Sequence, residues 1–181
     1  MTHDAHADIA LNDSAGRAGA IFSPCMTWRY SLWRDWSDMV AAPRRVMFLM
    51  LNPSTADHLK LDPTVTRCAA FARAWGFTVL EVCNLFALRA TDPDALYVHA
   101  DPVGPGNDDY IALAAGRADL IVCAWGNHAA LQTRGRAVTA ALSGHRLHAL
   151  RLNGSGHPAH PLYLPGSLQP QPWTPWQGRS K

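Results

Sequence analysis

The segment VMFLMLNPSTAD, residues 46–57, places six apolar residues directly before a turn-forming Asn52-Pro53 pair. A short apolar run that ends at a turn is typical of a strand buried on both faces. It is far shorter than the ~20 residues that span a bilayer. Comparable runs occupy residues 78–84, 120–125 and 145–152. Strands of this kind occur in the middle of a layered α/β domain.

Helical patterns separate these runs. Asp62 and Pro63 supply an N-cap and a first-turn proline, and apolar residues then recur at helical spacing until Gly76. Further helices are expected from about residue 107 and over residues 128–142. Strands that alternate with helices need right-handed crossovers, which give a parallel sheet with helices on both faces.

The limits of the folded unit follow from composition. Residues 26–36 alternate between apolar and polar and predict an N-terminal edge strand or hairpin. We expect a flexible tail over residues 1–24, one α/β domain over residues 25–164 and a proline-rich tail over residues 165–181. The predicted fold class is a three-layer α/β/α domain with a mainly parallel central sheet of about four strands plus that edge strand or hairpin.

Composition excludes several classes of protein. The chain has 181 residues, 48% of them hydrophobic, which fits one ordered domain. The net charge of +2 permits a nucleic-acid partner without demanding one. Four cysteines without a C-x-x-C pair argue against a metal site, and we expect no cofactor. The first 22 residues lack the features of a signal peptide, so a cytoplasmic location is expected.

Polar residues follow each predicted strand. Ligands of parallel sheets bind at the carboxyl ends of the strands, so these exits are expected to form one cleft. Neither a G-x-S-x-G elbow nor a G-x-x-x-x-G-K phosphate loop is present, which gives little support to acyl transfer or nucleoside triphosphate hydrolysis. The exits carry Asn52, Asn84, the group Trp125 to His128, and His157 with His160.

Several of these motifs together resemble a known family. The motif MLNPSTAD, the segment NLFALRAT over residues 84–91, Trp125-Gly126 and HPLY over residues 160–163 are similar to a bacterial and phage domain family of unknown function. The resemblance covers about residues 26–164. More distantly, the order of the Asn-Pro, Asn, Gly and His-Pro strand ends resembles the uracil-DNA glycosylase superfamily, which implies a fold of that type with its active site on the strand ends.

The superfamily resemblance implies catalytic roles. Asn52 would position a water molecule, and His160 would donate a hydrogen bond to a base oxygen, or His157 if the register shifts by three residues. The amide of Asn52 cannot act as a base, so Asp57 or Asp62 would have to take that role. An Asp at either position can also simply cap a turn or a helix. Met50 and Ser54 stand where the superfamily has glycines, so we expect slow catalysis or a labile base.

The resemblance also implies contacts with the ligand. Asn84 would read the edge of an extruded base, and Phe86 is the candidate for stacking. Phosphate contacts would position a strand without reading its sequence. The candidate phosphate-binding residues are Ser54, Thr55, Arg89 and Arg67.

The leading hypothesis is a DNA glycosylase-like hydrolase that releases an unusual, damaged or modified base. The alternatives are an N-glycosidase or related enzyme that acts on free nucleosides or nucleotides, and a catalytically silent nucleic-acid-binding module. The expected partner is therefore DNA or a nucleoside or nucleotide, with no membrane involved. The sequence does not set the oligomeric state.

Overall fold

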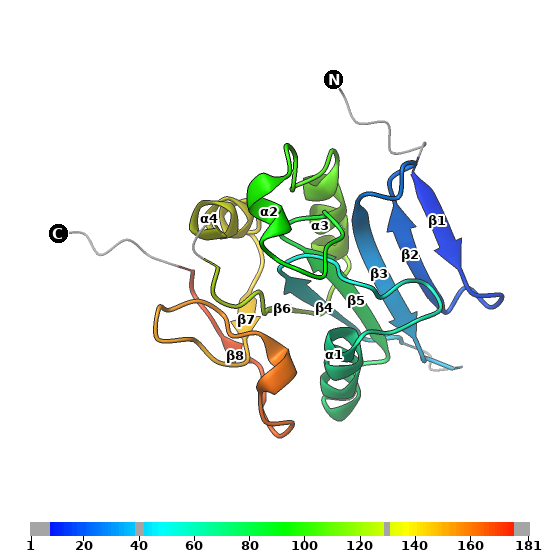
Figure 1. Cartoon of the computed structure of the whole chain (residues 1–181). Coiled ribbons are helices and arrows are strands. Elements are labelled where there is room, and N and C mark those ends of the chain that lie inside the picture. Colours follow the sequence, from blue (N-terminus) through cyan, green and yellow to red (C-terminus); the bar gives the residue numbers. More distant parts are fainter. Residues whose placement is uncertain (1–7, 39–41, 129–130, 176–181) are drawn as a thin grey trace.

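One mixed sheet runs through the structure, which is a computed structural model describing residues 8–38, 42–128 and 131–175 (Figure 1). Within those residues the sheet has eight strands in the order β1-β2-β3-β5-β4-β6-β7-β8. The strands are β1 (Ile9–Asn12), β2 (Ala18–Phe22), β3 (Arg29–Asp35), β4 (Arg45–Met50), β5 (Val79–Asn84), β6 (Leu120–Cys123), β7 (Leu147–Ala149) and β8 (Gln171–Pro172).

The predicted fold class, a mainly parallel sheet of about four strands of the uracil-DNA glycosylase type, is wrong. Four of the seven strand pairings are antiparallel: β1 with β2, β2 with β3, β3 with β5, and β7 with β8. The other three pairings are parallel and join β5, β4, β6 and β7, which contain the four apolar runs. Those strands make up only half of a mixed sheet.

The prediction missed strands β1 and β2 because their signal is weak. They have four and five residues, too few to show a clear period. The turn between them is built from Asp13, whose carboxylate accepts hydrogen bonds from the backbone N–H groups of Arg17 at 2.8 Å and Ala18 at 3.1 Å. Gly16 takes a φ of 69°, a conformation that favours glycine. The hairpin covers one edge of β3, so of the two alternatives that the sequence left open the edge position is wrong, while β3 pairs antiparallel with both of its neighbours.

Helix α1 (Pro63–Ala74) confirms the predicted start and end of the first helix. The Asp62 carboxylate accepts a hydrogen bond from the N–H of Val65 at 2.7 Å, and Pro63 occupies the first turn. The chain leaves the helix through Gly76, whose φ of 76° ends the helical path. The buried face of α1 packs on the sheet through Val65, Cys68, Phe71 and Ala72. The N-terminus of α1 thereby lies near the carboxyl ends of the central strands.

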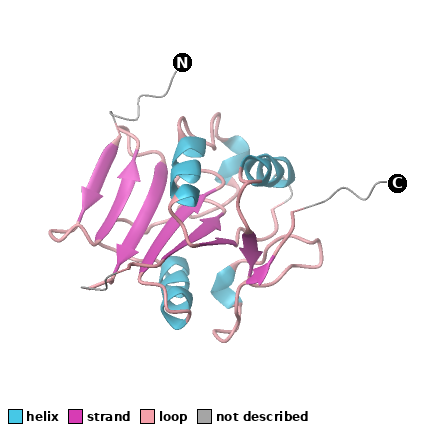
Figure 2. Cartoon of the chain, turned by 180° about the vertical axis from the view of Figure 1, so that it is seen from behind, coloured by secondary structure: helices cyan, strands magenta, loops and turns pink. Residues whose placement is uncertain are grey.

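The other helices are α2 (Ala95–Val98), α3 (Asn107–Gly116), α4 (Leu131–Ala141) and the 3-10 turn η2 (Pro161–Tyr163). Residues of α2, α3 and α4 join the apolar cluster that contains Met47 and Leu49 of β4. Residues of α1 belong to the other cluster, with Val46 and Phe48. The sheet therefore carries helices on both faces (Figure 2). Residues 129 and 130, at the start of the predicted helix over 128–142, lie outside the described residues.

The sheet extends beyond residues 25–164 at both ends. Strands β1 and β2 precede that range, and β8 follows it. Trp173, next to β8, is 9% exposed and packs against Trp125 with ring centroids 5.6 Å apart. Residues 1–7 and 176–181 of the predicted tails lie outside the described residues. No helix in the described ranges is long and apolar enough to cross a membrane.

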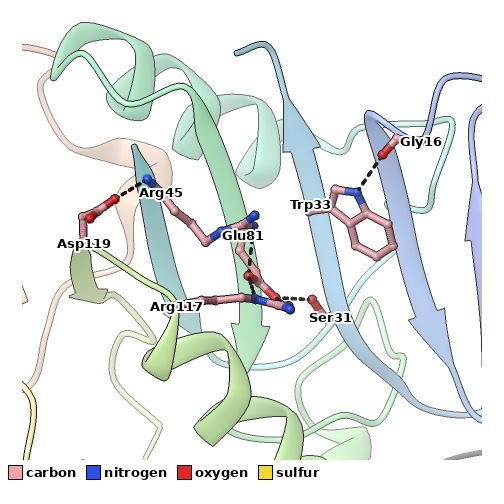
Figure 3. A network of polar contacts seen from close by, with 7 residues as sticks. All are labelled: Gly16, Ser31, Trp33, Arg45, Glu81, Arg117 and Asp119. Carbon is pink, nitrogen blue, oxygen red and sulfur yellow. Dashed lines mark hydrogen bonds and ion pairs between the residues drawn. The ribbon is translucent and has the colours of Figure 1, made fainter. Parts of the chain in front are cut away.

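The one glutamate of the chain, Glu81, is completely buried in β5 (Figure 3). Its carboxylate accepts hydrogen bonds from Ser31 at 2.9 Å, Arg45 at 3.2 Å and Arg117, whose Nε lies at 2.9 Å. Two guanidinium groups thus neutralise the buried charge. The network ties β3, β4 and the end of α3 to the middle of β5.

Candidate active site

A cavity of about 310 Å³ opens at the carboxyl ends of β4, β5 and β6. We call it the first cavity. The parallel pairing of these strands brings their exits to one edge of the sheet, as the sequence predicted for the cleft. The start of β3 and the N-terminus of α1 complete the wall. The polar residues that carry the following argument are Arg29, Asn52, Asp62, Asn84 and His160, all of which line this cavity.

Asn52 follows β4 and is held in one orientation by two carbonyl groups. Its amide nitrogen donates to the backbone oxygen of Ala90 at 2.8 Å and to that of Pro53 at 3.1 Å. Because carbonyl oxygens only accept, the nitrogen of the amide must face them. The Oδ1 atom of Asn52 is therefore left as an acceptor, which can receive a hydrogen bond from a water molecule.

His160 stands immediately before η2, and the backbone fixes the position of its proton. The Nδ1 atom accepts a hydrogen bond from the N–H of Leu162 at 3.4 Å. In a neutral imidazole the proton then resides on Nε2, which becomes a donor. Burial lowers the pKa of His160 below its ordinary value, and nearby Asp62 opposes that shift. The ring is therefore neutral at pH 7 and carries its N–H on the other nitrogen.

Gly126 forms the turn that follows β6 and lies beside His160. It adopts a φ of 82°, at which a residue with a side chain would be strained. A Cβ placed on it would lie 3.4 Å from the Cβ of His160, an ordinary van der Waals distance. The backbone conformation, and not a lack of space, therefore accounts for the glycine of the Trp125-Gly126 motif.

Asn84 ends β5 and is 1% exposed. Its Nδ2 has no hydrogen-bond partner among the residues that the structure describes. The backbone around it is held by Asn107 of α3, whose side-chain nitrogen donates to the carbonyl oxygens of Asn84 and Leu85, each at 3.1 Å. Asn84 lines the first cavity, so this donor, which has no acceptor among the described residues, is a candidate for contact with a ligand there.

Arg29 is the residue that the sequence analysis missed. Its side chain is 2% exposed, although the alternating pattern of residues 26–36 indicated a half-buried strand with Arg29 on the polar face. Strand β3 lies inside the sheet, between β2 and β5, and its first four residues are all buried, the polar ones included. The alternating pattern does not indicate this burial on both faces, because it arises from the tertiary packing of the strand.

The guanidinium of Arg29 is nearly without partners. Its Nη1 donates to the backbone oxygen of Ala56 at 2.6 Å, and its Nε has no partner among the described residues. No described carboxylate lies within 4.0 Å of it. Burial lowers the pKa of Arg29 to about 10, while Asp62 opposes the shift. The group thus stays positively charged at pH 7.

Asp57 and Asp62 take different positions. Asp62 lines the first cavity and caps α1. Asp57 is not among the residues that line it. Its carboxylate accepts hydrogen bonds from the N–H groups of Leu59 at 2.8 Å and Lys60 at 2.7 Å, which lower the pKa of Asp57. The structure therefore places Asp57 in a turn and leaves Asp62 as the carboxylate in the cavity wall.

His157 and Phe86 also lie away from the lining of the first cavity. His157 is buried, and its backbone oxygen accepts a hydrogen bond from the N–H of Asn153 at 2.8 Å. Phe86 is 7% exposed and packs in the apolar cluster on the α3 face of the sheet. Of the two histidines that the sequence left open, His160 is the one in the cavity wall.

The four residues predicted to bind phosphate do not all lie together. A second cavity of about 500 Å³ is lined by Thr55 and Arg89, and it shares Ser54, Ala90 and Thr91 with the first cavity. Arg89 donates to the backbone oxygen of Met26 at 3.0 Å. Arg67 instead bonds the backbone oxygen of Leu164 and lies over the ring of Phe71, outside both linings.

Comparison with known protein families identifies the family of this chain. A family model with the description "Protein of unknown function (DUF1643)" matches residues 29–162. The matched segment begins at Arg29 and includes His160, so it contains the whole lining of the first cavity. Neither the curated proteins nor the solved structures include a match.

Proposed function

We propose that this chain, which belongs to the DUF1643 family, hydrolyses the N-glycosidic bond of an unusual, damaged or modified base in DNA. In this reaction the bond between the sugar carbon and the base nitrogen breaks. Water supplies a hydroxyl to the sugar and a proton to the departing base. The observation that carries the proposal is the meeting of Asn52, Asn84 and His160 in the wall of one cavity.

The three side chains match the needs of the reaction. Negative charge develops on the departing base, and the N–H at Nε2 of His160 can stabilise it at a base oxygen. The unpartnered Nδ2 of Asn84 can hold the edge of an extruded base. The Oδ1 of Asn52 can orient the attacking water, although it cannot take the proton from it.

The order of the motifs adds support. The Asn-Pro, Asn, Gly and His-Pro strand ends resemble those of the uracil-DNA glycosylase superfamily in both type and order. The resemblance supports the proposal only through the residues at the strand ends. It does not extend to the sheet, because the sheet is mixed and has eight strands among the described residues.

The second cavity favours a DNA strand over a free nucleoside. It shares Ser54, Ala90 and Thr91 with the first cavity, so a strand whose base enters the first can continue along the second. Arg89 lies in its lining and can contact a phosphate. A free nucleoside would leave this second surface unused.

The test is incubation of the full chain with single- and double-stranded oligonucleotides that carry a panel of modified bases. Abasic sites are scored by alkaline strand cleavage, and the corresponding free nucleosides are assayed in parallel for base release. We expect abasic sites with at least one modified base. If only the nucleosides are split, the enzyme is a nucleoside N-glycosidase, and if neither substrate class is split, the proposal is wrong.

A further inference from the structure

Arg29 presents an unusual electrostatic situation in the first cavity. A buried charge is costly unless a carboxylate or several hydrogen bonds compensate it. Arg29 is almost fully buried, yet among the residues that the structure describes its side chain makes a single hydrogen bond, to a neutral carbonyl oxygen. By contrast, the buried charge of Glu81 in the same sheet is matched by two guanidinium groups. A negatively charged ligand would complete the surroundings of Arg29.

The bonding pattern of Arg29 also favours a particular shape of anion. Nη1 donates to the Ala56 oxygen, whereas the buried Nε has no partner among the described residues, so we assign the edge formed by Nε and Nη2 to a ligand in the cavity that Arg29 lines. Two parallel N–H groups on one edge of a guanidinium match the two oxygens of a carboxylate.

Other groups in the cavity wall add to this preference. Asn84 offers its unpartnered Nδ2, and His160 offers the N–H at Nε2. Both groups donate hydrogen bonds, as does Arg29. The carboxylate of Asp62 is the opposing group, and one of its oxygens is bonded to the N–H of Val65 at the start of α1. Donors therefore outnumber acceptors where these side chains meet.

We propose that the first cavity selects a nucleobase that carries a carboxylate, and that Arg29 is the residue that determines this specificity. The inference rests on the proposed function in assuming that the ligand is a base. The carboxylate would form two hydrogen bonds with the Nε and Nη2 edge of Arg29. Asn84 and His160 would then bind acceptor atoms of the ring.

A purely structural role for Arg29 is the alternative, and the chain offers a matched control for it. Arg34, on the same strand, donates to the backbone oxygen of Asp57. Asp57 follows Ala56, to which Arg29 donates. Arg34 also donates to the backbone oxygen of Trp33 at 2.7 Å. Arg34 holds the same loop without lining the first cavity. Replacing each arginine in turn with methionine separates two effects: the attachment of the loop, and the positive charge that Arg29 places beside the ligand.

The test is calorimetric titration of the full chain with uracil, 5-carboxyuracil, the methyl ester of 5-carboxyuracil, and inorganic phosphate. We expect 5-carboxyuracil to bind at least about tenfold more tightly than uracil or the ester, as a charge-assisted hydrogen bond implies. Arg29→Met should abolish this preference, Arg29→Lys should retain part of it, and Arg34→Met should leave it intact. Thermal melting of each variant establishes that it is folded.

Two results would overturn the inference: equal binding of 5-carboxyuracil and its ester, or an unchanged preference in folded Arg29→Met. Phosphate binding as tight as that of 5-carboxyuracil would also overturn it, because the site would then recognise an anion without a base. Base release from oligonucleotides is measured separately with the same set of bases. A carboxylate preference without release from any oligonucleotide would refute the glycosidase function while supporting this specificity.

Discussion

The contact between His160 and the N–H of Leu162 exists only while the Nδ1 atom of His160 is unprotonated. Protonation would turn this acceptor into a second donor and break the contact. Burial lowers the pKa of His160, and it also lowers the pKa of His157. Both rings therefore resist protonation in the folded state.

This resistance predicts a pH dependence of stability. In the unfolded chain a histidine takes up a proton near its ordinary pKa of 6.5, whereas the folded chain takes it up only at lower pH. The unfolded state thus binds more protons below pH 6.5, and the free energy of unfolding should fall as the pH decreases from 7 to 5. Denaturant titrations at several pH values measure this slope. His160→Ala should show a shallower slope, and an identical slope would contradict the assignment.

Asn52 gives a second prediction at the residue scale. In Asn52→Asp a carboxylate oxygen would replace the nitrogen that faces the carbonyl oxygens of Ala90 and Pro53. Two acceptors would then oppose each other, and we expect a loss of roughly 1–3 kcal/mol in the free energy of unfolding. Asn52→Ala should cost less, because it removes the donor without adding repulsion. Denaturant unfolding compares the two variants. A fully stable Asn52→Asp protein would contradict the two contacts between the Asn52 amide nitrogen and these carbonyl oxygens.

At the scale of elements, the Glu81 network determines how firmly β3, β4 and the end of α3 are attached to β5 (Figure 3). Glu81→Gln would leave Arg45 and Arg117 without their counter-charge. Because both arginines can turn toward water, we expect a cost of about 1–3 kcal/mol, less than for a wholly buried pair. Denaturant unfolding measures it.

The control for this prediction is the ion pair between Arg17 and Asp38, whose side chains are 53% and 67% exposed. Asp38→Asn should cost about 0–1 kcal/mol, as is usual for surface pairs. Equal losses in Glu81→Gln and Asp38→Asn would contradict the structural role given to the Glu81 network.

The elements also show what the sequence could predict. Asn52, Asn84 and His160 were found because each follows an apolar run, and parallel strands bring such exits together. Arg29 was missed because β3 lies inside the sheet and is buried on both faces at its start, which its alternating sequence does not indicate. The hairpin of β1 and β2 was missed for a related reason, since its short strands are stabilised by the sheet and not by a local pattern.

At the scale of the whole molecule, the N-terminal hairpin is part of the core. Ala20 and Phe22 of β2 are completely buried, and β2 pairs with β3 along most of its length. Removing residues 1–23 would delete these two buried side chains, expose the apolar residues that they cover and leave β3 as an edge strand. We expect a loss of several kcal/mol, since burial of one Phe side chain alone contributes about 1.5–3 kcal/mol. Thermal and denaturant unfolding of the shortened chain test this, and unchanged stability would contradict the assignment of β2 to the core.

We propose that His160, and not His157, stabilises charge on a departing base. Single-turnover base release from the best oligonucleotide of the panel by the parent chain, His160→Ala and His157→Ala tests this role. Loss of one donor to a developing negative charge costs about 2.7–4 kcal/mol, or roughly a hundredfold to a thousandfold in rate. We predict that loss for His160→Ala and a nearly parental rate for folded His157→Ala. A parental rate in His160→Ala would contradict the claim.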